Sequence, residues 1–404
     1  MLSSETVSGE IVEKTITDED IEKLRGMIGV KLRLENGGYI REASTDTIVS
    51  FSNGIGDVNP LYRDSEYGKW TRFGGMIAHP LFPYALYWPG RTHWGLPGIH
   101  GFFAGNDWQF YRNVRAGERI NAYVRVVGIE EKQSKFSGRL VIQYTETIYT
   151  NNRDERVARV LGWCTRHERK AARENKKYEN IKKDEYSKEQ LDTIYRVSME
   201  EREKIRGKRT RYWEDVNVGD DLEPIVRGPL SLHDTMGFLV ACGRGHTHGL
   251  LLSEALSHPA HYFQNLEAGG GIEYTGIGHH REDIAREVGV PGAYDYGPQR
   301  ISWLGSLVTN WMGDDGFMVR LRGEIRRFNI FGDTTWLKGK VSGKRIQNGY
   351  PLVDLEVWAE NQRGEKTAPG SATVALPSRE PKNEFVINGE DIEIDLPFHV
   401  KGKE

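Results

Sequence analysis

The sequence lacks the features that mark several specialised classes of protein. Only two of its 404 residues are cysteines, Cys164 and Cys242, and their spacing matches neither a CxxC pair nor a Cys/His zinc motif. No segment is apolar for long enough to span a bilayer, and the polar, acidic first twenty residues lack the basic start and apolar run of a signal peptide. We therefore expect a cytoplasmic protein without a disulfide framework, a metal site or a membrane anchor.

The chain also lacks an excess of charge of one sign. Its 55 basic and 58 acidic residues are intermixed and give a formal net charge of -3. Because no large field of one sign results, nucleic acid and membrane surfaces are poor candidate partners, and small molecules or proteins are better ones. A length of 404 residues suits two or three domains of ordinary size.

Residues 48–88 are the stretch around which the rest of the chain is organised. A polar segment rich in turn formers holds Asp57, Asn59 and Pro60 in a turn flanked by Gly54 and Gly56, where a short acidic side chain can be presented to a cleft or can simply cap the turn. The apolar run LFPYALYW at 81–88 follows and predicts a buried core helix. His79, just before it, is expected to shape the loop.

This stretch carries a resemblance to a known family. The segment GDVNPLYRDSEYG followed by FGGMIAHPLF resembles the signature of the MaoC-like dehydratases, the (R)-specific enoyl-CoA hydratase family. The family pattern is Gly-Asp-x-Asn-Pro-aliphatic-His, with the Asp and the His as the catalytic pair. Asp57 matches the Asp, whereas Tyr62 stands at the His position, as in the non-catalytic N-terminal halves of two-part dehydratases. The resemblance implies a hot-dog fold, in which a curved antiparallel sheet wraps around one central helix.

Two runs of alternating polarity predict antiparallel strand meanders. The first covers 108–167 and the second 318–376, both rich in β-branched and aromatic residues with a period of two. Between them, residues 168–209 are dominated by charged side chains with sparse apolar positions, which is typical of a solvated helical connector.

The architecture of the first half returns in the second. A polar loop with glycines, a Gly297-Pro298 hinge, an apolar helix and a meander follow one another there, and Gly117 and Gly332 both precede an acid before a strand at an offset of 215 residues. A repeat of this size indicates two homologous domains and not a solenoid. We therefore predict an α+β protein with a tandem (double) hot-dog fold. Its parts would be an N-terminal, degenerate domain at 1–167, a linker at 168–209, a catalytic domain at 210–380 and a tail at 381–404.

Hydration of an enoyl thioester needs a base for water, an acid for Cα and donors for the thioester oxygen. The first amides of a helix supply such donors, and both halves place a helix start after a glycine and proline turn. By resemblance, the catalytic His lies six residues before a small helical residue. His279 stands six before Ala285, and His280 is the adjacent option.

The acid that would partner this histidine is left open, because Tyr274 stands where the family has Asp. Glu273, groups of the segment GRGHTHG at 243–249, and Asp57 are the candidates. For Arg300, binding of a CoA phosphate and an ion pair with Asp295 are both open. The substrate-binding set that we predict is Asn59, Tyr62, Gly75, Tyr296, Gly297 and Arg300.

The resemblance implies a hydro-lyase, an acyl-CoA hydratase or dehydratase, with coenzyme A as part of its substrate and without a metal or redox cofactor. Tyr62 and an aromatic-rich loop suggest a bulky acyl group. We also expect a homo-oligomer, a dimer or higher. Two different functions also fit the sequence, namely a hot-dog acyl-CoA thioesterase and a non-catalytic acyl-CoA-binding subunit of a larger dehydratase.

Overall fold

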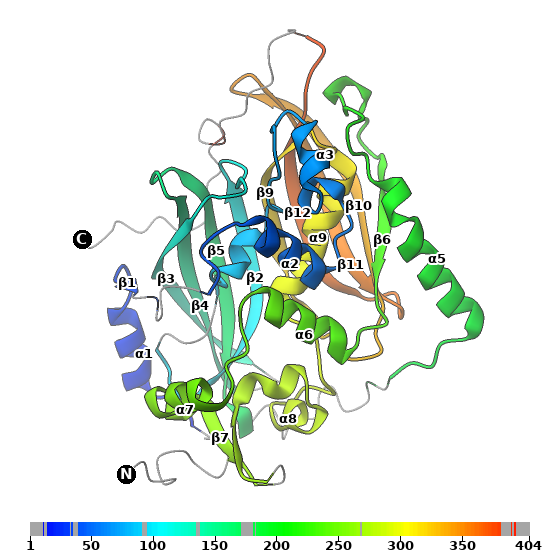
Figure 1. Cartoon of the computed structure of the whole chain (residues 1–404). Coiled ribbons are helices and arrows are strands. Elements are labelled where there is room, and N and C mark those ends of the chain that lie inside the picture. The colour runs from blue at the N-terminus through cyan, green and yellow to red at the C-terminus, as the bar shows by residue number, and fades with distance from the viewer. Residues whose placement is uncertain are drawn as a thin grey trace.

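The computed structural model describes residues 11, 14–32, 34, 39–90, 95–134, 138–170, 181, 183–266, 269–380, 389 and 392. Most of its strands form one large antiparallel sheet that curves around a central helix (Figure 1). The strands of this sheet are β1 (Lys31–Leu32), β2 (His100–Phe110), β3 (Ile120–Ser134), β4 (Gly138–Asn151), β5 (Arg156–His167), β6 (Asp221–Arg227), β9 (Phe317–Glu324), β10 (Thr335–Gln347), β11 (Tyr350–Asn361) and β12 (Lys366–Ala375).

The strand order shows the internal repeat directly. It runs β1-β3-β4-β5-β2-β9-β12-β11-β10-β6, so that each half has the same order when it is read from its own outer edge. β2 and β9 pair antiparallel at the centre, with Trp108 opposite Leu321. The sheets of the two halves therefore continue into one another, and the predicted tandem hot-dog arrangement is confirmed.

Alternating burial along the strands explains why the meanders form. In β11, Val357 and Ala359 are fully buried, whereas Trp358 and Glu360 are partly exposed. Successive side chains of a strand point to opposite faces, so this pattern leaves one face of the sheet for the core and one for solvent. Both predicted meanders are present.

Helix α9 (Gly297–Met312) is the central helix of the second half, and every residue from Pro298 to Met312 is buried. In the first half the matching run at 81–88 is also buried, but the predicted helix is wrong. It forms only the 3-10 turn η4 (Phe82–Ala85). Pro83 lacks a backbone N–H and its ring clashes with the preceding turn, so a regular helix cannot pass through this position.

Helices α2 (Thr45–Ile55) and α6 (Leu232–Ala241) cross at close range over α9 (Figure 1). A Cβ atom at Gly54 would lie only 2.5 Å from the Cβ atom of Ala241, so the crossing requires glycine. The stretch from residue 48, expected to begin as a turn-forming loop, is therefore helical up to Ile55, and the loop starts at Gly56.

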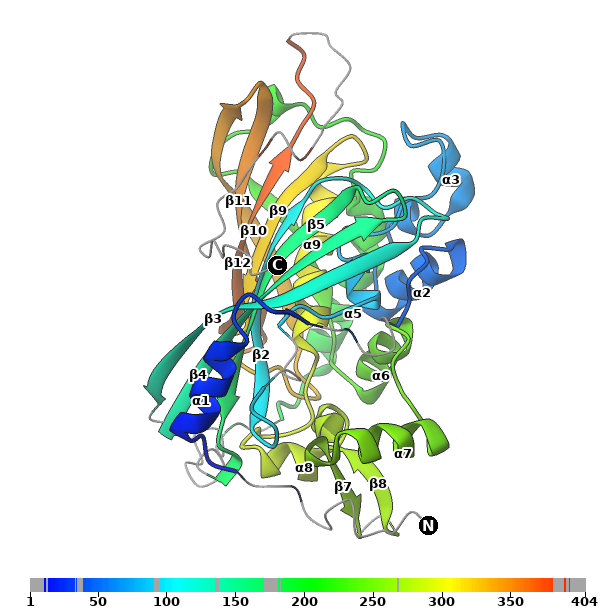
Figure 2. The ribbon, with the colours of Figure 1, turned by 90° about the vertical axis from the view of Figure 1, so that its left-hand side faces the viewer.

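The other elements lie outside this centre. The charged connector contains α5 (Lys188–Lys204), which packs Ile194 and Val197 against β6 and confirms the predicted helix. The segment between α6 and α9, which we call the insertion, contains α7, β7, β8 and α8 and lies at one end of the molecule (Figure 2). The remaining elements are α1 (Asp18–Gly26), η3 (Pro60–Tyr62), α3 (Ser65–Lys69), η5 (Trp213–Asp215), α7 (His248–Ser257), η6 (Pro259–His261), β7 (Tyr262–Asn265), β8 (Gly271–Tyr274), η7 (Thr275–His279) and α8 (Glu282–Glu287).

The part of the chain that the structure describes contains neither a membrane-spanning helix nor a group of metal ligands. No helix in these ranges is long and apolar enough to cross a membrane. In the same ranges, no three His, Cys, Asp or Glu side chains are grouped so that they could hold a metal ion. The predicted domain boundaries stay a prediction, and most of the predicted tail at 381–404 lies outside the described residues.

Candidate functional site

Equivalent helix ends identify two corresponding sites, one in each half. α2 and α6 are both followed by a glycine in the left-handed conformation, Gly56 with φ 67° and Gly243 with φ 65°. Left-handed backbone favours glycine because it has no Cβ atom. The next residue is Asp57 in the first half and Arg244 in the second. By this correspondence Arg244 stands at the position of the family Asp, and not Tyr274 as the spacing to His279 predicted, so this position carries opposite charges in the two halves.

The residues before the central helices also correspond. His79 lies 6.2 Å from the ring of Phe51, and Tyr296 lies 5.9 Å from the ring of Phe238. Each phenylalanine precedes its left-handed glycine by five residues. We call the surroundings of Asp57 and His79 the Asp57 site, and the surroundings of Arg244 and Tyr296 the Arg244 site.

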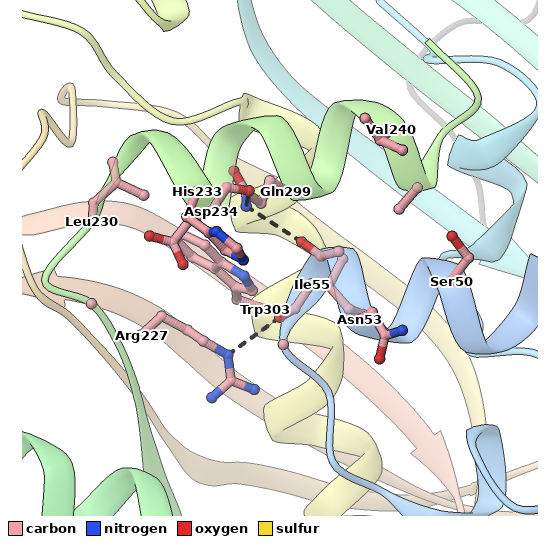
Figure 3. Close-up of a pocket in the computed structure, with 15 residues that line it drawn as sticks. Ser50, Asn53, Ile55, Arg227, Leu230, His233, Asp234, Val240, Gln299 and Trp303 are labelled. Carbon is pink, nitrogen blue, oxygen red and sulfur yellow. Dashed lines mark hydrogen bonds between the residues drawn. The ribbon is translucent and has the colours of Figure 1, made fainter. Parts of the chain in front are cut away.

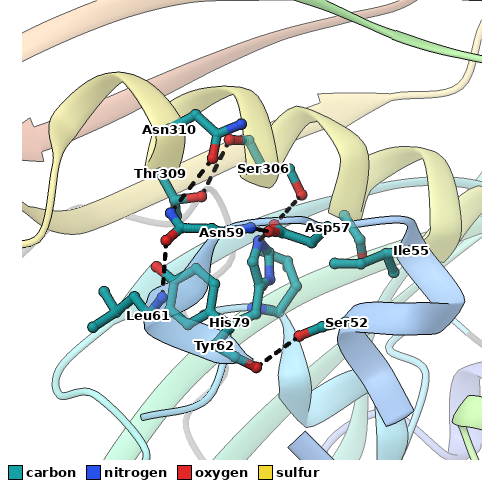
Figure 4. Close-up of polar contacts among 12 residues, drawn as sticks. Ser52, Ile55, Asp57, Asn59, Leu61, Tyr62, His79, Ser306, Thr309 and Asn310 are labelled. Atoms are coloured by element: carbon teal, nitrogen blue, oxygen red, sulfur yellow. Dashed lines mark hydrogen bonds and ion pairs between the residues drawn. The ribbon is translucent and has the colours of Figure 1, made fainter. Parts of the chain in front are cut away.

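The Asp57 site is a fully buried polar cluster (Figure 4). Asp57 accepts a hydrogen bond of 2.7 Å from the amide of Asn59 and another of 2.7 Å from the hydroxyl of Ser306 on α9. His79 Nδ1 accepts from the amide of Leu81 at 3.1 Å, so its proton is on Nε2, 3.7 Å from Asp57 Oδ2. Burial raises the pKa of Asp57 and lowers the pKa of His79 to about 3.

Asn59 and Tyr62 complete this cluster. The Asn59 side chain accepts from the amide of Leu61 at 3.1 Å and donates to Asn310 at 3.4 Å. Tyr62 is 1% exposed and meets the ring of His79 edge-on at 5.3 Å. These contacts join the first half to α9 of the second half. They agree with the possibility that Asp57 and Asn59 cap the turn, and they leave no exposed group for a substrate.

The Arg244 site is built mainly from aromatic rings. The guanidinium carbon of Arg244 lies 3.8 Å from the ring centre of Trp88 and 4.2 Å from that of Tyr39. Trp88 lies 5.2 Å from Tyr296 and stacks on Phe238 at 5.5 Å. Cation–π attraction is stronger where water is excluded, so this packing holds a positive charge beside the start of α9.

The two predicted histidines belong to this second site. His280 Nε2 lies 3.2 Å from the hydroxyl of Tyr296, and the ring of His279 stacks on Tyr296 at 4.0 Å. His279 Nδ1 faces the carbonyl oxygens of Tyr294 and Asp295 at 3.1 and 3.2 Å, so Nδ1 carries the proton and Nε2 is the basic nitrogen.

The protonation of these groups follows from burial. Burial lowers the pKa of His279 to about 3 and also lowers the pKa of His280, so both imidazoles are neutral at pH 7. Burial raises the pKa of Tyr296, an effect that the positive charge of Arg244 opposes. A neutral base and a protonated hydroxyl therefore meet at one place.

The start of α9 adjoins Tyr296, and the ring of Phe103 packs against Gly297 there. Tyr296 is the N-cap residue, and no side chain caps the first turn of the helix. Gly297 and Pro298 open the helix, and the amides of the first turn are without partners in the helix itself. The positive end of the helix dipole adds to the positive charge of Arg244.

The predicted site residues thus fall into two separate groups. Asp57 contacts Ser306, nine residues along α9 from Gly297, which corresponds to about 14 Å at 1.5 Å per residue. Asp57 therefore does not partner His279 or His280. Gly75 lies in the turn beside Gly68 of α3, on the Asp57 side.

Glu273 and the segment at 243–249 do not supply an acidic partner for the histidines either. Glu273 pairs with Arg281 at 3.1 Å and accepts from Asn265 at 2.9 Å. From the segment at 243–249, Arg244 is part of the site, and the ring of His246 lies 6.0 Å from that of Tyr39 and 4.0 Å from Glu254. The second half therefore keeps imidazoles at its site but places a cation at the position of the family Asp.

Arg300 has the structural role that the sequence left open. It is 1% exposed, it pairs with the buried carboxylate of Asp295, and it donates to the carbonyl oxygen of Arg327 at 2.7 Å. Its guanidinium is thus used inside the fold, and the structure does not support its predicted contact with a CoA phosphate.

Sequence reasoning does not assign Tyr39 or Trp88 to the site, and it considers Arg244 only as a possible partner of the histidine. Trp88 is the last residue of the apolar run at 81–88, where a core or interface aromatic is the simplest expectation. One signal could have identified Arg244. In both halves a Gly closes an apolar helix, with one residue, Cys242, between α6 and Gly243, and the residue after that Gly is Asp57 or Arg244.

Comparison with known proteins bears on the fold of the chain. Residues 35–160 match the family model described as FAS1-like, dehydratase domain region. A solved structure named MaoC-like dehydratase is 16% identical, with a TM-score of 0.59 over 88% of this chain and 99% of that one. A putative MaoC domain protein dehydratase from Chloroflexus aurantiacus is 14% identical, with a TM-score of 0.52 over 87% and 96%.

A third structure carries the fold name itself. It is a conserved hypothetical protein from Mycobacterium tuberculosis, described as having a double hotdog fold, and it is 12% identical with a TM-score of 0.50 over 86% of this chain and 96% of that one. A comparison with functionally curated proteins gave no match. The chain therefore has the double hot-dog fold, and the resemblance to MaoC-like dehydratases that the motif in the first half carries is confirmed.

Proposed function

We propose that the protein is a hydro-lyase that adds water to, or removes it from, the α,β double bond of an enoyl-CoA thioester at the Arg244 site. The observation that supports this most is the contact of 3.2 Å between His280 Nε2 and the Tyr296 hydroxyl at the start of α9. The MaoC-like fold and the dehydratase match in the first half support the same class of reaction.

Each group has a role in this proposal. His280 takes a proton from the water that attacks Cβ, and the Tyr296 hydroxyl delivers its proton to Cα. The imidazolium of His280 then returns a proton to the Tyr296 oxygen across their contact, so that the net change is the addition of one water. The first amides of α9 and the charge of Arg244 stabilise the negative charge that builds on the thioester oxygen. His279 stacks on Tyr296 and orients it.

The size of the acyl group is part of the proposal. We keep the expectation of a bulky acyl group from the sequence. Because α9 closes the Asp57 site, this group would have to lie at the Arg244 site. Faster turnover of branched or cyclic enoyl-CoAs than of crotonyl-CoA is the expected result. The reverse preference would contradict this part of the proposal and leave the reaction class intact.

The test is an absorbance assay for loss of the enoyl-thioester band with a panel of enoyl-CoAs. Tyr296→Phe removes only the hydroxyl and should lower kcat by about 10²- to 10⁴-fold. Tyr294→Phe is the matched control, because its ring also contacts His279, at 4.1 Å, while the bond to His280 comes from Tyr296. Equal activity of the two variants would overturn the site.

A thioesterase and a binding subunit would give different results in the same assay. A thioesterase would release free CoA from a saturated acyl-CoA. A non-catalytic binding subunit would bind acyl-CoA with no turnover until a catalytic partner is added. Either result would replace the hydro-lyase proposal.

A further inference from the structure

Helix α6 exposes a stripe of apolar side chains. Leu232, Met236 and Val240 are 49%, 39% and 60% exposed, and their spacing of four residues places them along one line of the helix. Both views of the chain show α2, α6 and α7 along the same side of the molecule, the front in Figure 1 and the right-hand side in Figure 2. On α7, Leu250 is 68% exposed. We call the surface formed by these three helices the α6 face.

A hollow of about 250 Å³ lies next to the stripe, between α2 and α6 (Figure 3). Gly237 and Val240 line it from α6, Ile55 lines it from α2, and Trp303 lines it from α9. A Cβ atom at Gly237 would meet nothing within 4 Å, so the space next to this glycine is open. The exposed side chain of Met236 and the open space at Gly237 are therefore neighbours along α6.

The α6 face carries few charges for a surface made of helices. Among the 11 residues of α2 and the 10 of α6, the charged side chains are Asp46 and Asp234, whereas nine of the 17 residues of the solvated helix α5 are charged. Arg227 also lines the hollow, but it pairs with Glu201 at 2.6 Å, so its charge is compensated. Depletion of charge is the compositional mark of the centre of a protein interface.

The partner that these features fit is a second copy of the same chain. A projecting side chain and a hollow at neighbouring positions complement themselves when a two-fold axis brings two copies of α6 together in antiparallel orientation. Methionine suits the projecting position because its unbranched side chain adapts to irregular spaces. The scarcity of charge matters as well, since a face with an excess of one sign would repel its own copy.

We propose that the protein forms a two-fold dimer through the α6 face, with Met236 of each copy in the hollow at Gly237 of the other. Leu232 of one copy then lies near Val240 of the other. The 10 residues of α6 span about 15 Å, and a standard interface buries roughly 800 Å² on each partner, so α2 and α7 share the contact. The inference does not depend on the proposed reaction, because it concerns the mass of the particle and not turnover.

Sedimentation velocity of the full chain at micromolar concentrations tests the proposal. The wild-type protein should sediment as a dimer. Met236→Glu places two carboxylates beside the axis and should raise the dissociation constant at least about a hundredfold. Met199→Glu is the matched control and should leave the dimer intact, because Met199 is 79% exposed among the charged residues of α5. A monomeric wild-type protein, or a Met236→Glu variant that dimerises as tightly as the wild type, would overturn the proposal.

A cross-link locates the axis. The two natural cysteines are buried, so they do not compete with an introduced surface thiol. On oxidation, Met236→Cys should link two chains, because the two copies of this position lie beside the axis within reach of a disulfide. Met199→Cys should stay unlinked under the same conditions. Equal cross-linking of the two variants, or none in either, would contradict the inference.

The hollow itself is tested at Gly237. Gly237→Trp can fill the open space without a clash in its own chain, so it should weaken the dimer at least about tenfold while the fold is kept. Gly237→Ala adds only one methyl group and should leave dimerisation close to that of the wild type. Sedimentation and circular dichroism of both variants are the measurements. A Gly237→Trp variant that is folded and dimerises as tightly as Gly237→Ala would show that Met236 does not enter the hollow and would overturn the proposed contact.

Discussion

The Asp57 site and the Arg244 site occupy the same position in the two halves but have opposite character. Asp57 is closed off by a hydroxyl from α9, whereas Arg244 lies among aromatic rings beside two imidazoles and an uncapped helix start. The first half keeps the family Asp with Tyr62 in place of the family His. The second half obtains its histidines from an insertion. The contrast shows that the Asp57 position is a joint between the halves, while the groups that we propose to react lie in the other copy.

One pair of variants tests this contrast most severely. His280→Ala should lower kcat for enoyl-CoA hydration by about 10²- to 10⁴-fold, because it removes the proposed base. Asp57→Asn should retain activity, since the Asn oxygen can still accept from Asn59 and the group is closed off by α9. Steady-state kinetics with both proteins is the measurement. Loss of activity in Asp57→Asn alone would exchange the roles of the two sites.

The buried ion pair next to the Arg244 site should give the next largest change. Arg300→Met leaves the Asp295 carboxylate buried without its partner and should lower the free energy of unfolding by about 3–5 kcal/mol. Arg196→Met is the control, because its pair with Glu200 is exposed and should contribute little to stability. Urea unfolding checks both. An unchanged stability with a weakened affinity for CoA would restore Arg300 as a phosphate ligand.

The crossing of α2 and α6 allows a comparison of two glycines, one from each half: Gly54 is packed against the other helix, whereas Gly237 faces open space. Gly54→Ala places a Cβ atom 2.5 Å from that of Ala241 and should cost about 1–3 kcal/mol. Gly237→Ala, on the open side of α6, should instead stabilise by about 0.5–1 kcal/mol. Thermal unfolding of the two variants measures the difference. Equal melting temperatures would show that the helices can separate at little cost.

A more modest change concerns the response of the Asp57 site to acid. The pKa of His79 falls from 6.5 to about 3 in the folded state, so the unfolded chain binds a proton that the folded chain does not. The contribution of neutral His79 to the free energy of unfolding is therefore complete above pH 6.5. It is lost as the pH falls below this value, by about 1.4 kcal/mol per pH unit. His79→Asn can keep the bond from Leu81 but not the titration. Denaturant unfolding between about pH 6 and 5 should therefore show a shallower pH dependence for the variant. Equal slopes would mean that His79 is protonated in the folded state.

Much of the fold could be predicted from local patterns. Alternation of period two predicts the strands of both meanders, and the charged composition predicts α5, because these signals depend on which face of each element meets water. The run at 81–88 shows where such reasoning fails. Its apolar character predicts burial correctly, but Pro83 prevents the helix that the repeat with α9 suggests.

For the site, the order of amino acids is enough to reveal the motif around Asp57, the two-copy organisation and the presence of His279 and His280 before α9. It does not reveal that α9 of the second half closes the Asp57 position or that Arg244 packs against the rings of Tyr39 and Trp88. Hydrogen bonds and ring contacts between residues more than a hundred positions apart, such as Asp57 with Ser306 or Trp88 with Arg244, depend on how the two halves pack, and no local pattern contains that information.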